Sequence, residues 1–273
     1  MSKVAAIQMA SGPNVKANMA EAEKLISIAV QQEAKLIVLP ENFAIMGMSE
    51  MDKVNAAEQP GNGPIQNFLK EQARKHHVWI VGGTVPLASD DIGRVYAASM
   101  LYNDSGEEVA RYNKIHLFDV TIEANNESYT ESDTTVSGDE VVVADTPFGK
   151  IGLAVCYDLR FPELFRAMAD AGMEICVLPS SFTSLTGKAH WESLLRARAI
   201  ENLSFVIAAA QGGYHVNGRE THGDSMIIDP WGVVLNRLPH GTGVVVSDIN
   251  MKMLERTRKA FPVLNHRRID CKI

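Results

Sequence analysis

The sequence predicts an α/β fold in a single domain covering residues 1–273. Strand-like segments rich in valine, isoleucine and alanine alternate with helix-like segments to the end of the chain, a pattern typical of this class. No linker rich in proline, glycine or serine and no low-complexity tract interrupts them. A chain of 273 residues can hold one large domain or two small ones, and the unbroken alternation favours one.

An internal echo suggests how the strands are arranged. Residues 36–40 (LIVLP) are echoed by residues 175–179 (ICVLP), and a phenylalanine follows three residues later in each case, at Phe43 and Phe182. We interpret the echo as two similar helix-to-strand units that contribute corresponding strands, which suits an architecture of paired sheets. The tripeptide Val-Leu-Pro can also recur by chance in a valine-rich sequence.

The individual elements follow from runs of apolar residues and their spacing. Strands are expected at residues 4–10, 36–40, 78–85, 95–103, 140–145, 150–156, 174–179, 204–211, 224–229 and 243–249. Helices are expected at residues 18–33, 63–76, 162–171, 188–202 and 250–259, the last four with apolar residues at three-to-four spacing. The apolar stripe of helix 188–202 indicates a core or an interface between subunits.

Composition excludes several classes of partner. The formal net charge is −7, and the basic cluster at residues 266–268 is too small to make a nucleic-acid or anionic-membrane surface. The first ten residues suit a strand better than a signal peptide, and no membrane-spanning run is present. Three cysteines, Cys156, Cys176 and Cys271, show no paired spacing. A disulfide framework is therefore not expected, and a reducing cytoplasm fits.

Cys156 stands where an apolar run meets charged residues. In residues 150–164 (KIGLAVCYDLRFPEL), the segment before it is typical of a buried strand, and Pro162 suits the first turn of a helix. Cys156 is therefore expected at the carboxyl end of a strand, where open α/β sheets bind ligands. The alternative is a cysteine that merely packs as a small hydrophobic residue, which is the commoner case.

Two charged residues have similar settings. Glu41 directly follows LIVLP, and burial there would raise its pKa toward the range useful for a base. Lys114 lies among Tyr112, Ile115 and Phe118, where a lysine can hold an oxyanion. The alternatives are a glutamate that caps a turn or pairs with a surface lysine, and an ordinary solvated lysine.

Together these three residue types make chemical sense. A cysteine needs a base to become a thiolate, and the tetrahedral intermediate formed on an amide carbon needs positive charge beside its oxygen. One carboxylate can also pass the proton to the departing amine and later activate water. The chemistry requires no metal and no cofactor.

Three segments carry a family resemblance. LPENF around Glu41, YNKIHLFD around Lys114 and CYDLRFPEL around Cys156 resemble, in order and spacing, the motifs of the nitrilase (carbon–nitrogen hydrolase) superfamily, along the whole chain. The resemblance implies that Glu41 is the general base, Lys114 the oxyanion stabiliser and Cys156 the nucleophile. It also implies that Glu131 is a second active-site glutamate and that the backbone N–H of Tyr157 completes the oxyanion hole.

The resemblance also implies a fold and an assembly. Members of the superfamily form a four-layer α-β-β-α sandwich, usually dimerised through helical faces into eight layers. This agrees with the α/β fold predicted from the residues alone. Packing within such a homodimer or higher homo-oligomer is the further role expected of helix 188–202.

Residues beside the motifs point to one branch. CYDLRFPEL and the segments 179–202, 208–215, 222–232 and 261–268 are similar to deaminated-glutathione amidases and the neighbouring omega-amidases. Where those relatives often have a cysteine, this chain has Gly212, so that loop is a candidate for altered substrate choice.

Arg160 and Thr186 are the candidate substrate-binding residues. The Arg160 guanidinium, four residues after the cysteine, can grip a carboxylate in a bidentate way. By the resemblance it binds the substrate carboxylate, and Thr186, in the SLTG loop, supports that carboxylate with its hydroxyl. The alternative for Arg160 is an ion pair with Asp158 or Glu163.

Other chemistries find no support in the sequence. The eight histidines show no zinc-ligand spacing, and His190 is expected to be structural. The segment at residues 223–227 (GDSMI) lacks the second glycine of a serine-hydrolase elbow, and residues 241–243 (GTG) open no nucleotide-binding motif.

The sequence therefore predicts an amidase acting on a small, carboxylate-bearing amide, such as deaminated glutathione or a related α-keto acid monoamide, through a cysteine thioester. The same mechanism on another C–N bond remains open, as in an omega-amidase of other substrates, a carbamoyl hydrolase or a nitrilase. A non-catalytic binding or scaffold protein is the alternative from a different class.

Overall fold

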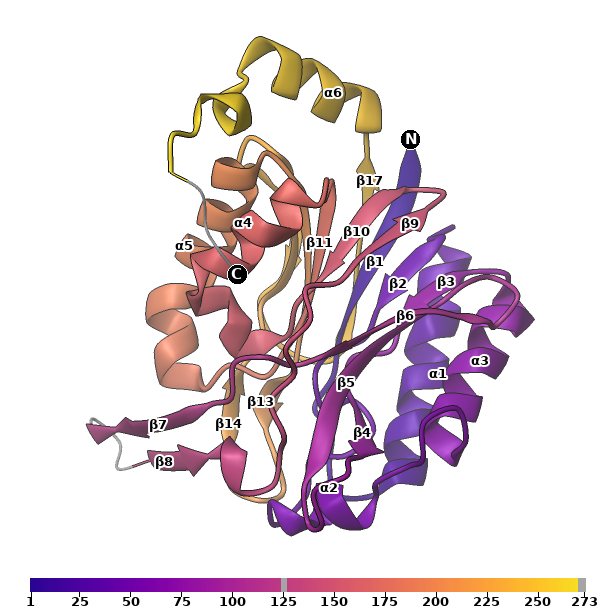
Figure 1. Ribbon diagram of the computed structural model, residues 1–273. Coiled ribbons are helices and arrows are strands. Elements are labelled where there is room, and N and C mark those ends of the chain that lie inside the picture. The colour runs from indigo at the N-terminus through magenta and orange to yellow at the C-terminus, as the bar shows by residue number, and fades with distance from the viewer. Residues whose placement is uncertain (124–126, 270–273) are drawn as a thin grey trace.

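Two mixed sheets face one another in the computed structural model, which describes residues 1–123 and 127–269 (Figure 1). The strands are β1 (Ser2–Gln8), β2 (Leu36–Val38), β3 (Trp79–Val81), β4 (Val85–Ala88), β5 (Val95–Tyr102), β6 (Glu108–Asn113), β7 (Asp119–Ile122), β8 (Glu127–Thr130), β9 (Val143–Thr146), β10 (Gly149–Leu153), β11 (Ile175–Ser180), β12 (Phe205–Ala210), β13 (Gly212–Tyr214), β14 (Glu220–His222), β15 (Ser225–Ile228), β16 (Val234–Leu238) and β17 (Gly243–Ile249). The helices are α1 (Val15–Gln31), α2 (Met51–Asn55), α3 (Pro64–His76), α4 (Pro162–Asp170), α5 (Ser184–Asn202) and α6 (Met251–Ala260).

Each sheet is built around three parallel strands. The first has the order β17-β1-β2-β3-β5-β4, with β6 on the far side of β5, and β1, β2 and β3 run parallel. The second has the order β16-β15-β12-β11-β10-β9, with β10, β11 and β12 parallel. Antiparallel strands extend both sheets outward. The parallel strands read as continuous apolar runs because both of their faces are covered.

The side chains of β2 show how the layers are filled. Leu36 and Val38 point into the core between the two sheets, whereas Ile37 belongs to the core between the first sheet and helices α1 and α3. Successive side chains of a strand face opposite ways, so a strand with all three residues fully buried must be covered on both sides. Helices α4 and α5 cover the outer face of the second sheet (Figure 1).

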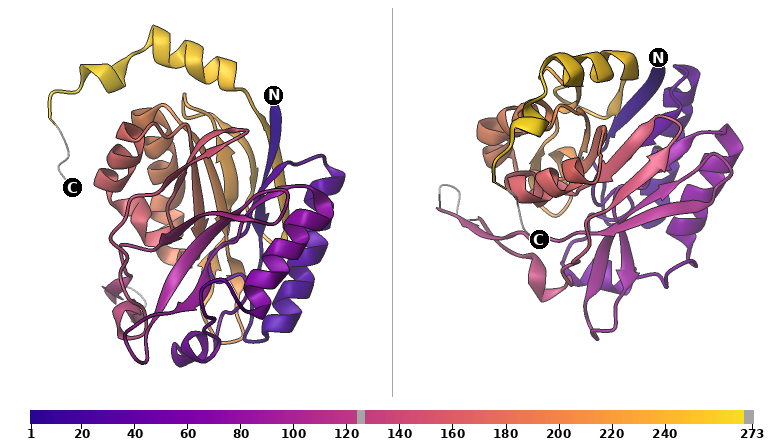
Figure 2. Two further views of the ribbon diagram at one scale, coloured as in Figure 1. Left: turned by 45° about the vertical axis from the view of Figure 1, so that its right-hand side comes forward. Right: turned by 45° about the horizontal axis from the view of Figure 1, so that its top comes forward.

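Local signals set the starts of the helices. The Asn14 side chain accepts a hydrogen bond from the N–H of Ala17 at 3.1 Å and caps α1. Pro64 and Pro162 occupy the first positions of α3 and α4, where a missing N–H costs nothing. Figure 2 shows α6 across one end of the molecule and the β7–β8 hairpin reaching out near the opposite end.

The four-layer α-β-β-α sandwich is confirmed, and the internal echo has a structural counterpart. Strands β2 and β11 carry the two similar segments, occupy central positions in their sheets and contact each other. The expected strand 78–85 is wrong as one element, since residues 82–84 separate β3 from β4. Gly83 has φ +55°, and a Cβ there would lie 2.1 Å from the carbonyl oxygen of Pro40. This glycine lets the backbone pass close to the end of β2.

Candidate active site

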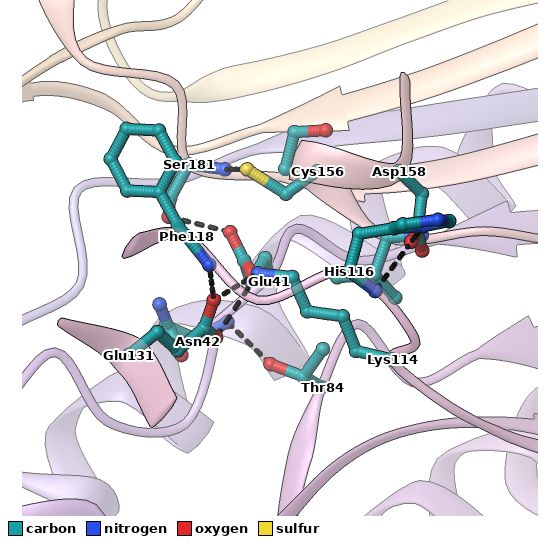
Figure 3. Close-up of polar contacts among 12 residues, drawn as sticks. Glu41, Asn42, Thr84, Lys114, His116, Phe118, Glu131, Cys156, Asp158 and Ser181 are labelled. Atoms are coloured by element: carbon teal, nitrogen blue, oxygen red, sulfur yellow. Dashed lines mark hydrogen bonds and ion pairs between the residues drawn. The ribbon is translucent and has the colours of Figure 1, made fainter. Parts of the chain in front are cut away.

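A cavity of about 420 Å³ opens beyond the ends of β2 and β11, and all seven predicted site residues line it. They are Glu41, Lys114, Glu131, Cys156, Tyr157, Arg160 and Thr186. They come from segments spread over nearly 150 residues of sequence, so only the closing of both sheets brings them together. Figure 3 shows the polar contacts at the centre of this group.

Cys156 occupies an unusual backbone position. Strand β10 ends at Leu153, three residues earlier than the expected strand 150–156, and Cys156 opens a 3₁₀ turn, Cys156–Arg160. Its φ is +47°, a left-handed conformation that costs a non-glycine residue about 1–3 kcal/mol. The N–H of Ser181, just after β11, lies 3.5 Å from its Sγ. The turn thus aims the thiol into the cavity while leaving it only 6% exposed.

A buried carboxylate holds this turn in place. Asp158 accepts hydrogen bonds from the N–H of Val155 at 2.8 Å, the Tyr112 hydroxyl at 2.7 Å and the N–H of His116 at 3.1 Å. His116 Nδ1 lies 2.7 Å from the same carboxylate. These contacts fix the backbone on both sides of Cys156 and occupy the lone pairs of Asp158.

Glu41 is presented by the turn that follows β2. Its Oε2 accepts a hydrogen bond from the Ser181 hydroxyl at 2.6 Å, and its Oε1 accepts one from Lys114 Nζ at 2.9 Å (Figure 3). Gln211 donates to its backbone carbonyl at 3.0 Å. The next residue, Asn42, has φ +57° and donates its N–H to Thr84 Oγ1 at 2.9 Å. The carboxylate is therefore held on both oxygens.

Lys114 follows β6 and lies between two carboxylates. Besides Glu41, its ammonium contacts both oxygens of Glu131, at 3.0 and 2.8 Å, and its side chain is almost fully buried. Glu131 also accepts the N–H of Phe118 at 2.8 Å. A buried lysine with two acidic partners keeps its charge and has a single position, which the alternative of a solvated lysine does not predict.

The pKa values of this cluster correct one expectation. Burial alone would raise the pKa of Glu41, but the Lys114 ammonium and the Ser181 hydrogen bond outweigh it and hold that pKa below its ordinary value. Burial, together with the charge of Glu41, raises the pKa of the Cys156 thiol well above its usual range. The acidic partners raise the pKa of Lys114 despite burial. The resting cluster is therefore a thiol, a carboxylate and an ammonium.

This arrangement can perform acyl transfer. The charge of the Glu41 carboxylate acts on the Cys156 thiol, and both groups line the same cavity, so a proton can pass from the sulfur to this carboxylate as the sulfur attacks an electrophilic carbon. The Lys114 ammonium contacts the same carboxylate and supplies fixed positive charge at a position that is itself almost fully buried.

Arg160 and Thr186 differ from their expected settings. Arg160 Nη1 lies 3.2 Å from His190 Nδ1, and the guanidinium lies over the rings of Tyr157 and Phe182, at 5.9 and 5.2 Å from their centroids. Among the described residues it makes no ion pair with a carboxylate, so the alternative partners Asp158 and Glu163 are excluded. His190 therefore positions this guanidinium instead of serving only as packing.

The expectation that Thr186 lies in a loop is wrong. The SLTG segment forms the first turn of α5, and Thr186 Oγ1 lies 2.8 Å from Thr183 Oγ1. Helix α5 begins four residues earlier than expected because residues 184–187 continue its hydrogen bonding, with the N–H of Gly187 donating to the carbonyl of Thr183 at 2.8 Å.

Sequence reasoning missed two residues of the site. Ser181 follows the ICVLP segment much as Glu41 follows LIVLP, so the internal echo was a signal that could have found it. Arg219, between β13 and β14, also lines the cavity, but its surroundings in the sequence hold no comparable pattern.

The other reactive residues lie elsewhere. Cys176 is fully buried in β11, and burial raises its pKa to about 12. Cys271 lies outside the described residues. Within residues 1–123 and 127–269, no three or more His, Cys, Asp or Glu side chains gather as metal ligands. In the same part of the chain, no helix has the length and apolar character needed to span a bilayer.

Several known proteins are similar to this chain in sequence and in fold. The carbon–nitrogen hydrolase family model matches residues 3–259. A Synechocystis sp. protein named deaminated glutathione amidase is 43% identical over 266 residues, covering 96% of this chain and 97% of that protein. The crystal structure of the C. elegans NitFhit protein matches with a TM-score of 0.88 and 34% identity, over 98% of this chain and 65% of that one. Saccharomyces cerevisiae Nit3, a member of branch 10 of the nitrilase superfamily, matches with a TM-score of 0.86 and 29% identity, over 96% and 94% of the two chains.

Proposed function

The chain belongs to the carbon–nitrogen hydrolase family and is an amidase, and we propose that its substrate is deaminated glutathione or a related α-keto acid monoamide. The observation that carries this proposal is one cavity in which a thiol, a carboxylate and an ammonium lie beside a guanidinium that has no acidic partner among the described residues. The first three groups supply the chemistry of amide cleavage. The guanidinium can bind a carboxylate, which is why we expect the substrate to carry one.

In the proposed reaction, Cys156 Sγ attacks the amide carbon while Glu41 takes the thiol proton. The oxyanion is stabilised by the Lys114 ammonium and the N–H of Tyr157. The C–N bond then breaks, Glu41 returns the proton to the departing amine or ammonia, and a thioester remains on the cysteine. Glu41 next takes a proton from water as the water attacks the thioester. The carboxylic acid leaves and the thiol is restored.

Three further residues have positioning and binding roles in this proposal. Glu131 contacts Lys114 with both of its oxygens and so keeps the ammonium between the two carboxylates. Arg160 binds the carboxylate of the acyl part, supported by the Thr186 hydroxyl at the start of α5. The stacking of Arg160 on Tyr157 and Phe182 favours this role, because it fixes the plane of the guanidinium before substrate arrives.

The cellular setting is also proposed. We infer a cytoplasmic enzyme, since the two cysteines within the described residues are unpaired.

We also infer a homodimer in which the outer face of α5 meets the same face of α5 in the second copy. Trp231 and Phe261, 60% and 49% exposed, contact each other there, and the exposed Ile200 of α5 packs against Gly232 beside them. A Trp231→Glu variant should shift the sedimentation coefficient toward that of a monomer.

The experiment that tests the activity is a substrate panel. Ammonia or amine release is measured on deaminated glutathione, an α-keto acid omega-amide, a carbamoyl compound and a nitrile, for the wild type, Cys156→Ala and Glu41→Gln. We expect turnover of the first two substrates and its loss in both variants. Preferred turnover of the carbamoyl compound or nitrile would overturn the substrate class. Undiminished turnover by Cys156→Ala would overturn the mechanism, and no turnover on any substrate would favour a binding protein.

A further inference from the structure

Arg219 is a second cation in the cavity with an unused donor. Its Nη2 donates to the carbonyl of Ser181 at 3.0 Å, and its guanidinium lies 4.9 Å from the centroid of the Tyr129 ring. Its Nη1 has no hydrogen-bond partner among the described residues and, unlike its Nε, is not closed off from solvent. This N–H group can therefore donate to an acceptor that a ligand brings into the cavity.

Two of the four basic side chains that line the cavity form no ion pair with another described residue. Lys53 pairs with Glu50 at 2.7 Å, and Lys114 pairs with its two glutamates. Arg160 and Arg219 are the other basic residues of the lining, and neither makes an ion pair within the described part of the chain. The cavity therefore offers two guanidinium groups to anions from outside.

An aromatic row separates these two guanidinium groups. The rings of Tyr129 and Phe118 lie 5.1 Å apart, and so do those of Phe118 and Tyr157, measured between centroids. All three residues line the cavity. Arg219 lies on the Tyr129 end of the row and Arg160 on the Tyr157 end, next to the nucleophile. The two sites for negative charge are thus set apart along one wall.

Glu127 is the carboxylate of the cavity lining that contacts Tyr129 at that end. Its carboxylate accepts the Tyr129 hydroxyl at 2.9 Å and forms no ion pair with the guanidinium. The charge of Arg219 partly opposes the rise in the Tyr129 pKa that burial causes, and Tyr129 lines the cavity. The positive charge therefore acts on the interior of the cavity.

We propose that Arg219 binds a second carboxylate, carried by the leaving amine of the substrate. This inference rests on the proposed function and deepens it. Deaminated glutathione has one carboxylate on its 2-oxo acyl part and another on the glycine of its cysteinylglycine part, on opposite sides of the scissile amide. Arg160 takes the first and Arg219 the second, with the glycine carboxylate accepting a hydrogen bond from the Arg219 guanidinium. An omega-amide that releases only ammonia lacks the second anion.

The test compares two substrates that differ only at the second carboxylate: deaminated glutathione and its C-terminal amide. The enzymes are the wild type, Arg219→Gln, Arg219→Lys, Arg160→Gln and, as a matched control, Arg256→Gln, an exposed arginine of α6. We expect the wild type to prefer the free acid in kcat/KM by about tenfold to a hundredfold, the range of one charge-assisted hydrogen-bonded pair. Arg219→Gln should abolish this preference, mainly through KM.

The remaining variants separate binding from structure. Arg219→Lys should keep part of the preference, because it keeps the charge without the planar fork. Arg160→Gln should slow both substrates and leave their ratio unchanged, and Arg256→Gln should match the wild type.

Equal losses on both substrates in the two Arg219 variants would reduce this residue to a support for Ser181 and overturn the inference, as would a wild type without preference. Either result leaves the amidase proposal standing. A wild type inactive on both substrates would overturn the two proposals together.

Discussion

Replacing Ser181 with alanine should move the pH dependence of the enzyme in a defined direction. The Ser181 hydroxyl donates to Glu41 Oε2 at 2.6 Å, and both residues are about 3% exposed. This hydrogen bond stabilises the charged form of Glu41 and is one of the causes that hold its pKa low. Without it the pKa of Glu41 rises, so a larger fraction of the base is protonated at any given acidic pH.

The size of the effect follows from the type of contact. A hydrogen bond to a charged group contributes about 1.5–3 kcal/mol, which corresponds to about one to two pH units. The acid limb of the kcat/KM profile reports the base in the free enzyme and should therefore move to higher pH by that amount. The neutral plateau should change less, because the N–H of Ser181 still faces Cys156 and Lys114 still faces Glu41.

The assay is kcat/KM for an amide substrate across the acid and neutral range. Ser204→Ala is the matched control, since Ser204 is also buried and its hydroxyl has no partner in the described structure. An acid limb in Ser181→Ala that coincides with that of Ser204→Ala would refute the reasoning. It would mean that Glu41 does not govern that limb, or that Lys114 alone sets its pKa.

Three other predictions concern the same cavity. Lys114→Met leaves the buried Glu41 and the partly buried Glu131 without their shared cation, so the free energy of unfolding in urea should fall by about 3–5 kcal/mol and activity should be lost. Iodoacetamide should modify Cys156 before Cys176, as located by peptide mass analysis, with parallel loss of activity, because Cys176 is fully buried in a strand and burial raises its pKa more than the charge of Arg198 lowers it. Arg160→Ala should lower kcat/KM about a hundredfold on a carboxylate-bearing amide and much less on an uncharged amide.

For each of these three predictions, one outcome would contradict it. Adding Glu131→Gln to Lys114→Met should restore part of the stability but no activity, and failure to restore any would locate the damage elsewhere. Full inactivation with Cys156 unlabelled, for example through Cys271, would sink the assignment of the nucleophile. Equal losses on both amides in Arg160→Ala would make this residue a structural support through His190.

The sequence by itself determined the layers and the chemistry-bearing positions. Continuous apolar runs such as residues 36–40 and 175–179 predicted corresponding strands, and the structure has them at the centres of the two sheets. Glu41 and Cys156 were placed by the same logic, since a polar residue just after a buried strand must emerge at the edge of a sheet. Such patterns are reliable because a buried strand requires apolar side chains at consecutive positions, which can be read directly from the sequence.

Short or exposed strands have no continuous apolar run that would predict them. Strand β6, with its exposed charged residues, was not predicted, and neither were the three-residue strands β13 and β14. The break after β3 was missed because its cause, the close approach of Gly83 to Pro40, is a contact between distant residues. Residue propensities and the spacing of apolar residues do not reveal a contact between residues that are far apart in the sequence.

Only the tertiary structure decided the state of the site. The sequence placed Glu41 at a buried position and so predicted a raised pKa, whereas Lys114 and Ser181, distant in sequence, reverse the sign. It also gave no indication that Arg219 would line the cavity without an ion-pair partner among the described residues. The physical reason is common to both: a pKa and a binding pocket are set by charges within a few ångströms, and those distances exist only once the two sheets have closed on each other.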